Sequence, residues 1–161
     1  ADAQFVARTT RFHPIGRRPV DSGNTDGAFC NIDPAEYLAQ ANSDRFVIVQ
    51  IEDPEPMDEL DAIAQVEGID MLLFGPGDFS HGIGVFGQWD HPRIAEARKL
   101  VVEAALRHGK FAGTLGSPDH VNELVDMGYR FISITADVVA LSEHCKTVIN
   151  EFNQALAKRA T

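Results

Sequence analysis

The segments VIVQIED at residues 47–53 and FGPGDFS at residues 74–80 carry most of the information in this sequence. Each belongs to an apolar run that ends in an acidic residue. Glu52 closes the first run, and Asp78 follows a Gly-Pro-Gly turn after the second. Apolar runs separated by amphipathic segments are typical of buried parallel strands joined by crossover helices. Because function in such sheets and barrels lies beyond the carboxyl ends of the strands, both acids are candidate site residues.

The two carboxylates have no cysteine or histidine ligand beside them. They therefore form a hard oxygen site, which suits Mg²⁺ or Mn²⁺. The alternative is that Glu52 and Asp78 cap the helices that follow, because acidic residues are favoured at helix starts. The local sequence leaves both interpretations open.

Composition limits the class of protein. A chain of 161 residues with 44% hydrophobic residues is sufficient for one domain with a sizeable core. The net charge of −10 argues against nucleic acid or an anionic membrane as partner, since both require basic patches. No apolar run approaches membrane-spanning length. Cys30 and Cys145 show no metal or redox spacing, so we expect a reducing cytoplasm.

The chain is predicted to alternate strands with helices. Strands are expected at 46–51, 69–75, 110–115 and 131–136, and helices near 55–66, from Asp90 to Gly109, after a Ser117 cap, and over 141–156. A long loop is expected after residue 75, and a short helix capped by Asp33 precedes the first strand. Four such units are half of a (β/α)₈ barrel, which takes about 250 residues, or a free-standing open sheet. The pattern alone does not separate these two folds.

The whole chain resembles the second half of an aldolase of the HpcH/HpaI family, the metal-dependent pyruvate aldolases. The resemblance rests on several phrases in family order: RFHPIGRRPV, EYLAQAN, VIVQIED, VEGIDMLLFGPGDFSHGIG, DHPRI, HGKFAGTL and GYRFISITADVVAL. It implies an α/β fold of the TIM-barrel type. Residues 1–161 would supply strands 5–8 and their helices, and we expect upstream sequence that completes the barrel.

The resemblance also implies roles for particular residues. Glu52 and Asp78 match the two acidic metal ligands, and Gln50 matches a substrate-contacting position on the same strand face. Gly77 and Asp78 match the turn whose backbone amides hold the carboxylate of the pyruvyl group. The implied cofactor is Mg²⁺ or Mn²⁺, with Co²⁺ as an alternative. It would act as a Lewis acid that stabilises an enolate.

The implied reaction is the cleavage or formation of a 4-hydroxy-2-oxo acid from pyruvate and an aldehyde. Relatives that decarboxylate oxaloacetate or act on acyl-CoA are alternatives, although this chain has no recognisable CoA-binding feature. A further alternative is a non-catalytic half-barrel that binds a metal or a keto acid.

The family's histidine–aspartate pair and its arginine lie on early strands that nothing in this chain matches. His81 is the best candidate for a base here, against the simpler interpretation of a solvated loop histidine. We therefore expect the isolated chain to be inactive. The resemblance implies a homo-oligomer, a trimer-based hexamer that exchanges the last helix between subunits. Trp89 and Phe86 are expected to pack on a neighbouring subunit or to cover the site, and His120 to be structural.

Overall fold

The fold is a four-stranded parallel sheet with helices, as the sequence predicts for an α/β protein. The structure, a computed structural model, describes residues 1–159. The strands lie in the order β1-β2-β3-β4, with the bounds Ile48–Ile51, Met71–Phe74, Phe111–Leu115 and Phe131–Ser133. The helices are α1 Asp2–Thr10, α2 Pro34–Asp44, α3 Leu60–Ala64, α4 Pro76–Gly82, α5 Pro92–Arg107, α6 Val121–Met127 and α7 Asp137–Ala157. Two short 3₁₀ helices, η1 Thr25–Cys30 and η2 Glu55–Glu59, complete the element order.

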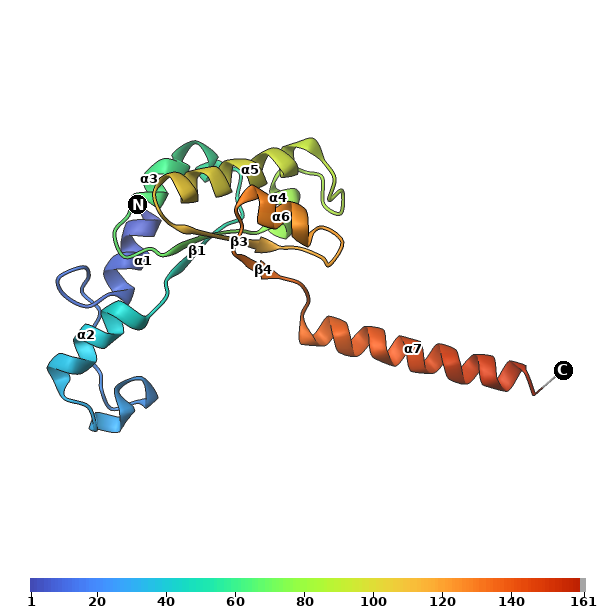
Figure 1. Cartoon of the computed structure of the whole chain (residues 1–161), viewed down its shortest axis with the longest axis horizontal. Helices are drawn as coiled ribbons and strands as arrows, with labels where there is room; N and C mark the ends of the chain where they lie inside the picture. Colours follow the sequence, from blue (N-terminus) through green and yellow to red (C-terminus); the bar gives the residue numbers. More distant parts are fainter. Residues whose placement is uncertain (160–161) are drawn as a thin grey trace.

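The core lies between the sheet and the helices that connect its strands. Helices α3, α4, α5 and α6 all lie on one side of the sheet (Figure 1). Alternate strand residues face them, because side chains in a strand alternate between its two faces. The buried cluster on this side includes Ile51, Leu72, Phe74, Ile94, Ala97, Val101, Ala112 and Leu124. The apolar residues of α5 at positions 94, 97, 101 and 104 are all buried.

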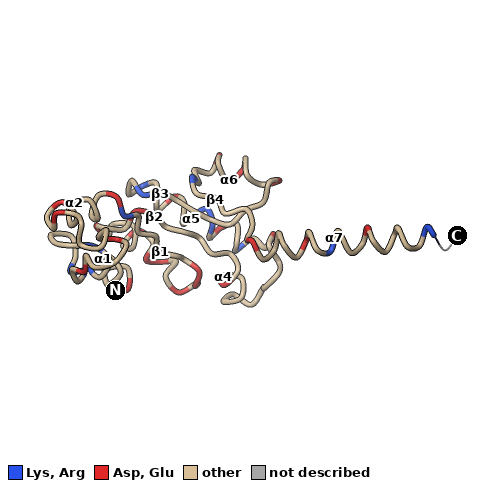
Figure 2. The backbone as a smooth tube through the Cα atoms, turned by 90° about the horizontal axis from the view of Figure 1, so that it is seen from below, with Lys and Arg blue, Asp and Glu red and all other residues tan. Residues whose placement is uncertain are grey.

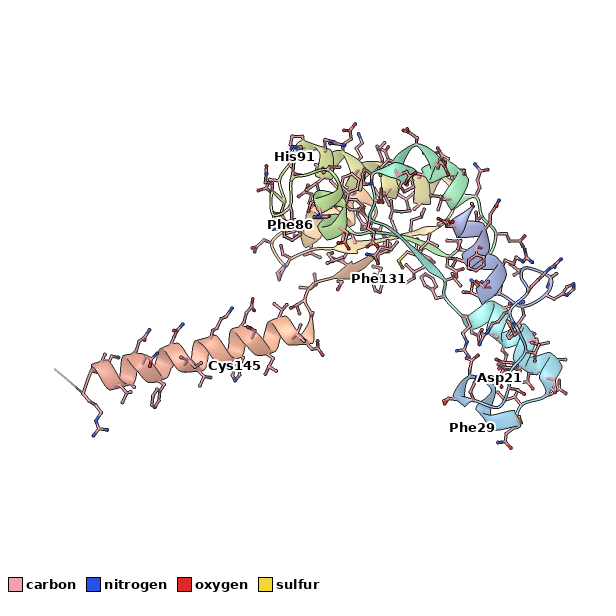
Figure 3. The ribbon with its side chains drawn as sticks, turned by 180° about the vertical axis from the view of Figure 1, so that it is seen from behind. Asp21, Phe29, Phe86, His91, Phe131 and Cys145 are labelled. Carbon is pink, nitrogen blue, oxygen red and sulfur yellow. The ribbon has the colours of Figure 1, made fainter. Side chains whose placement is uncertain are left out.

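The opposite face of the sheet is bare. No helix lies beneath it in Figure 1, and the large apolar side chains that are exposed there are Phe46, Ile48, Phe111, Leu115 and Phe131. Figure 3 shows Phe131 projecting from this side of the sheet. Exposed apolar area of this extent is typical of a surface that another structure covers.

Two predicted elements differ from the structure. Residues 76–82 form helix α4 directly after β2, where a long loop was expected, because Pro76 at the first helical position is already suited to a helix start. Ser117 does not cap α6. Its hydroxyl lies 3.0 Å from Nδ1 of His120, the N-cap residue. Val125 of α6 is exposed, whereas its neighbour Leu124 is buried. The predicted Asp33 cap is confirmed, since its carboxylate accepts hydrogen bonds from the amides of Ala35 and Glu36.

Helix α7 projects away from the rest of the molecule. In Figures 1 and 2 it leaves the end of β4 and packs on no other described element. Every residue in Asp137–Ala157 is exposed, including the apolar residues Leu141, Val148, Ile149, Phe152 and Leu156. Among residues 1–159, no helix combines the length and apolar character that a membrane span requires.

Candidate metal and substrate site

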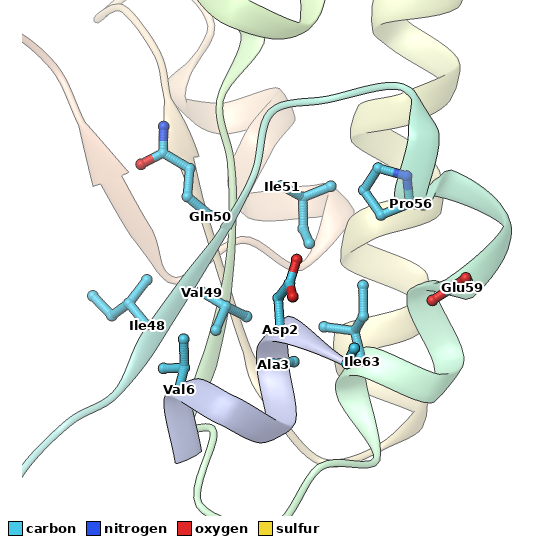
Figure 4. Close-up of a pocket in the computed structure, with 11 residues that line it drawn as sticks. Asp2, Ala3, Val6, Ile48, Val49, Gln50, Ile51, Pro56, Glu59 and Ile63 are labelled. Atoms are coloured by element: carbon cyan, nitrogen blue, oxygen red, sulfur yellow. The ribbon is translucent and has the colours of Figure 1, made fainter. Parts of the chain in front are cut away.

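The carboxyl ends of β1 and β2 bring the predicted site residues into one region. Ile51 of β1 pairs with Phe74 of β2, so Glu52 and Gly75 follow these strands at the same level. The Gln50 amide donates a hydrogen bond to a carboxylate oxygen of Glu52. Figure 4 shows Gln50 projecting from β1 on the side opposite to Ile51, away from the helix layer. The strand therefore directs Gln50 toward the bare face of the sheet.

Gly75 lies directly against these two side chains. A Cβ atom at this position would meet Gln50 Nε2 at 2.8 Å and Glu52 Cβ at 3.0 Å. The Gly75 amide donates to the carbonyl of Ile51 at 2.9 Å, which fixes the backbone there. Gly75 is therefore needed for close packing rather than for a left-handed backbone.

Asp78 lies in the first turn of α4 and is exposed. A ring contact and a hydrogen bond of the residues around Asp78 hold this turn in place. The Phe79 and Phe74 rings pack 5.4 Å apart, and the Ser80 hydroxyl donates to the carbonyl of Gly77 at 2.7 Å. Nothing lies within 4 Å of the position a Gly77 Cβ would occupy, so the space beside that residue is open.

Neither acid acts as a helix cap. Helix α4 has Gly75 as its N-cap, with no capping hydrogen bond from a side chain. After β1 the Asp53 carboxylate accepts a hydrogen bond from the amide of Glu55, and Glu52 receives only the Gln50 amide. Within residues 1–159, the Asp78 carboxylate accepts no hydrogen bond. Neither acid therefore makes a capping hydrogen bond, although Asp78 stands in the first turn of α4, where an acidic residue is favoured.

The donor set suits a hard divalent cation. Glu52 and Asp78 supply carboxylate oxygens, and no group of three or more His, Cys, Asp or Glu side chains that could hold a metal occurs among the described residues. Mg²⁺ is commonly held by one or two carboxylates, with substrate oxygens and water completing its octahedron. Two acids beside open space therefore fit such an ion better than zinc, which takes three or four protein ligands.

His81 lies in the last turn of α4, not in a loop as expected. Its side chain is exposed and makes no hydrogen bond within the described part of the chain. It is three positions after Asp78, so both side chains lie on neighbouring parts of the α4 surface.

Gln50 and Gly77 each line a cavity formed by the described residues. One, of about 350 Å³, lies along the edge of β1 and is lined mainly by Val6, Ile48, Val49, Ile51, Pro56, Glu59 and Ile63 (Figure 4). Gln50 borders it but points away from the helix side of β1, so this cavity marks the free edge of the sheet rather than the site. The other, about 400 Å³, is here named the rim cavity and is lined by Pro76, Gly77, Trp89, Arg98, Leu115, Gly116, Ser117, His120 and Leu124.

Sequence reasoning did not find the rim cavity. Its residues come from α4, the loop after it, α5, the end of β3 and α6, so no local motif reveals it. Arg98 is the one feature of the local sequence that could have indicated the cavity. It is a charged residue directly after Ala97, which is buried on α5.

Comparisons with known proteins agree with the phrases identified in the sequence. Residues 1–143 match the family HpcH/HpaI aldolase/citrate lyase. The 5-keto-4-deoxy-D-glucarate aldolase of Escherichia coli K12 is 30% identical over 138 residues, which cover 85% of this chain and 53% of that protein. The chain thus spans about half the length of the curated relatives it matches.

Solved structures show the same fold. An HpcH/HpaI aldolase from Desulfitobacterium hafniense DCB-2 superposes with a TM-score of 0.84 and 27% identity, over 92% of this chain and 58% of that one. A family protein from Burkholderia cenocepacia J2315 gives a TM-score of 0.83 and 30% identity, over 94% and 60%. The chain belongs to the HpcH/HpaI aldolase/citrate lyase family.

Proposed function

We propose that this chain forms the second half of a (β/α)₈ barrel and carries the metal-binding part of a divalent-metal-dependent aldolase. The observation that carries the proposal is the arrangement of Glu52 and Asp78. They follow neighbouring strands, neither caps a helix, and Gly75 packs against Glu52. The bare apolar face of the sheet supports the barrel, because the inside of a barrel is filled by side chains from all its strands.

Different groups of the site are proposed to bind the cation and the substrate. Glu52 and Asp78 would hold Mg²⁺ or Mn²⁺. A divalent ion there supplies Lewis acidity toward the oxygens of a 2-keto acid. Gln50 is proposed to contact the substrate and, through its hydrogen bond, to fix the Glu52 carboxylate. The open space beside Gly77 allows the backbone amides of Gly77 and Asp78 to approach a substrate carboxylate.

The proposed reaction is the reversible cleavage of a 4-hydroxy-2-oxo acid. The bond between C3 and C4 breaks, the C4 hydroxyl loses its proton to a base, and C3 is protonated to give pyruvate beside an aldehyde. The curated relatives named 5-keto-4-deoxy-D-glucarate aldolase support this class. His81 is the only histidine on α4, close in sequence to the proposed ligand Asp78. Within residues 1–159 no hydrogen bond orients its side chain, so we expect the base to come mainly from the other half of the barrel. The isolated chain is then inactive.

The proposed assembly is a homo-oligomer in which α7 packs on a neighbouring subunit, as in a trimer-based hexamer. The support is that the apolar residues of α7 are exposed and lie away from the sheet of their own chain.

The test is an aldolase assay of the full-length protein that contains this chain. Pyruvate, Mg²⁺ or Mn²⁺ and a panel of aldehydes should give 4-hydroxy-2-oxo acids, and chelation of the metal should stop turnover. Glu52→Gln should reduce turnover by at least about a hundredfold, since removal of one stabilising group in a preorganised site typically costs 10²–10³. Glu55→Gln is the matched control, an exposed acid in the same segment, and should leave turnover unchanged. Metal-independent turnover, or equal loss in both variants, would contradict the proposal.

A further inference from the structure

The rim cavity has mainly apolar walls. Its apolar lining residues include Pro76, Trp89, Leu115 and Leu124, which come from four separate segments of the chain, with Leu115 at the carboxyl end of β3. Its volume of about 400 Å³ lies within the range of small-molecule sites, which are predominantly apolar with a few placed polar groups. Gly77 forms one wall, whereas Glu52 and Asp78 do not line the cavity.

Arg98 places a cation in this apolar setting. Its Nε is buried and has no hydrogen-bond partner among the described residues. The side chain forms no ion pair there either, and no acidic residue lines the cavity although the chain has a net charge of −10. The buried Nε itself is closed to a ligand. An arginine side chain that lines a cavity without an acidic partner is nevertheless suited to an anionic ligand there.

Buried neighbours fix the backbone position of Arg98 in α5. The Tyr129 hydroxyl donates a hydrogen bond to the Arg98 carbonyl at 2.7 Å, and Tyr129 is fully buried. Ala97 and Val101, on either side of Arg98 in α5, are also buried. The backbone that carries the guanidinium is therefore part of the rigid core.

Ser117 and His120 add a second polar group to the cavity. The Ser117 hydroxyl and His120 Nδ1 lie 3.0 Å apart, which leaves the other ring nitrogen of His120 without a partner among residues 1–159. A hydroxyl and an imidazole can each donate a hydrogen bond to an oxygen atom.

We propose that the rim cavity is a second ligand site that binds a small organic carboxylate with an apolar body. It borders the proposed substrate site at Gly77 but does not include the proposed metal ligands Glu52 and Asp78. The carboxylate pairs with Arg98, because a guanidinium and a carboxylate match in charge and in planar geometry. The Ser117–His120 pair donates to the same group. An aromatic or branched body packs against Trp89, Leu115 and Leu124. An inorganic anion would satisfy Arg98 but would leave these apolar walls uncovered.

Trp89 provides a direct signal, since it is the only tryptophan in the chain and lines the cavity. Benzoate is the probe, benzamide is its neutral analogue, and inorganic phosphate is an anion without an apolar body. Benzoate should change the Trp89 fluorescence saturably, while benzamide and phosphate should bind at least about tenfold more weakly. In the full-length protein, the Trp89→Phe variant identifies the part of the signal that comes from this residue, and calorimetry gives the affinity independently.

Arg98→Gln should weaken benzoate binding about tenfold or more, because it removes a charged hydrogen-bond donor. Arg98→Lys, which keeps the charge, should retain intermediate affinity and serves if the glutamine variant does not fold. Arg93→Gln removes an exposed arginine from the same helix, outside the rim cavity, and should bind benzoate normally. Glu52→Gln should also bind benzoate normally, which separates this site from the metal. Equal affinity for benzoate and benzamide, unchanged binding in Arg98→Gln, or loss of binding in Glu52→Gln would each overturn the proposal.

Discussion

Gly75 shows how a single residue sets the geometry of the proposed metal site. Its neighbours in FGPGDFS have distinct structural roles. The Phe74 and Phe79 rings pack together in the core. Pro76 begins α4, and the Ser80 hydroxyl donates a hydrogen bond to the carbonyl of Gly77. Gly75 allows the end of β1 to approach the start of α4. The motif therefore positions Asp78 relative to Glu52 through packing as well as through chain connectivity.

We predict that Gly75→Ala disturbs the metal site more than its small size suggests. The added methyl group would meet the Gln50 amide nitrogen at 2.8 Å and displace Glu52. Overpacking of this kind typically costs about 1–3 kcal/mol of stability. Thermal unfolding should show that loss, and Mn²⁺ titration should show weaker affinity. Gly77→Ala is the control for Mn²⁺ affinity and stability, because nothing lies within 4 Å of its Cβ position. Normal Mn²⁺ affinity in Gly75→Ala would contradict this role.

The candidate site residues differ in how clearly the sequence indicates their positions. Glu52 and Asp78 stand at the ends of apolar runs, and this local pattern indicates strand ends in a parallel sheet. The helical state of residues 76–82 was not predictable from Gly-Pro-Gly, because this triplet is equally suited to a turn. Arg98 and His120 line the same cavity because of where α5 and α6 lie on the sheet, which no periodicity encodes.

At the scale of elements, the segment before α2 is held by a compact polar network. Arg18 and Arg45 both form ion pairs with Asp26, and the Tyr37 hydroxyl donates to the same carboxylate at 2.9 Å. The hydrogen bond from Arg18, followed by that from Tyr37, holds the pKa of Asp26 below its ordinary value of 3.8. Burial, and then the Asp26 hydrogen bond, raise the pKa of Tyr37.

This network predicts a pH-dependent contribution to stability. Because the pKa of Asp26 is lower in the folded chain than in the unfolded chain, ionised Asp26 stabilises the fold fully above about pH 4–5. The contribution is lost as the pH falls through the folded-state pKa. Asp26→Asn should therefore destabilise the protein by roughly 1 kcal/mol at pH 7, a value that allows for the partial exposure of these side chains.

Denaturant unfolding at several pH values checks this. The difference between the protein and Asp26→Asn should shrink below pH 4, and Asp21→Asn, an exposed acid nearby that makes no ion pair, should show a much smaller difference at pH 7. A difference that grows on acidification would contradict the assignment.

The order of strands and helices was largely predictable from the sequence, but the partners of their apolar faces were not. All four strands appear within the predicted segments, and α5 and α7 lie where apolar periodicity places them. Periodicity does not reveal what an apolar stripe packs against. The stripe on α7 looks like that of a core helix, yet none of its described residues is buried.

At the scale of the whole molecule, two apolar surfaces lack a partner within residues 1–159: the bare face of the sheet and helix α7. The first is expected to be covered by the remainder of the barrel, and the second by another subunit. Cys145 lies far from the sheet on α7 (Figure 3) and both cysteines are free and exposed, so no disulfide holds this helix.

We predict that the full-length protein is an oligomer that depends on α7. Phe152→Asp should shift it toward smaller species, because a charge in an apolar interface is costly to desolvate. Gln154→Asp adds the same charge two positions away, outside the apolar set, and should have a smaller effect. Light scattering at micromolar concentration measures both. A monodisperse monomer for the unaltered protein would refute the exchange of α7.

The most direct test of the central claim is Mn²⁺ binding by calorimetry to the full-length protein and its Asp78→Asn variant. Asparagine keeps the size of the side chain and its ability to cap a helix but removes the charge. The metal-site account predicts that Asp78→Asn loses measurable Mn²⁺ binding at this site, while Asp90→Asn, an exposed acid in the loop that follows, binds Mn²⁺ normally. Unchanged Mn²⁺ affinity in Asp78→Asn would contradict the account, because the carboxylate would then have no part in holding the metal.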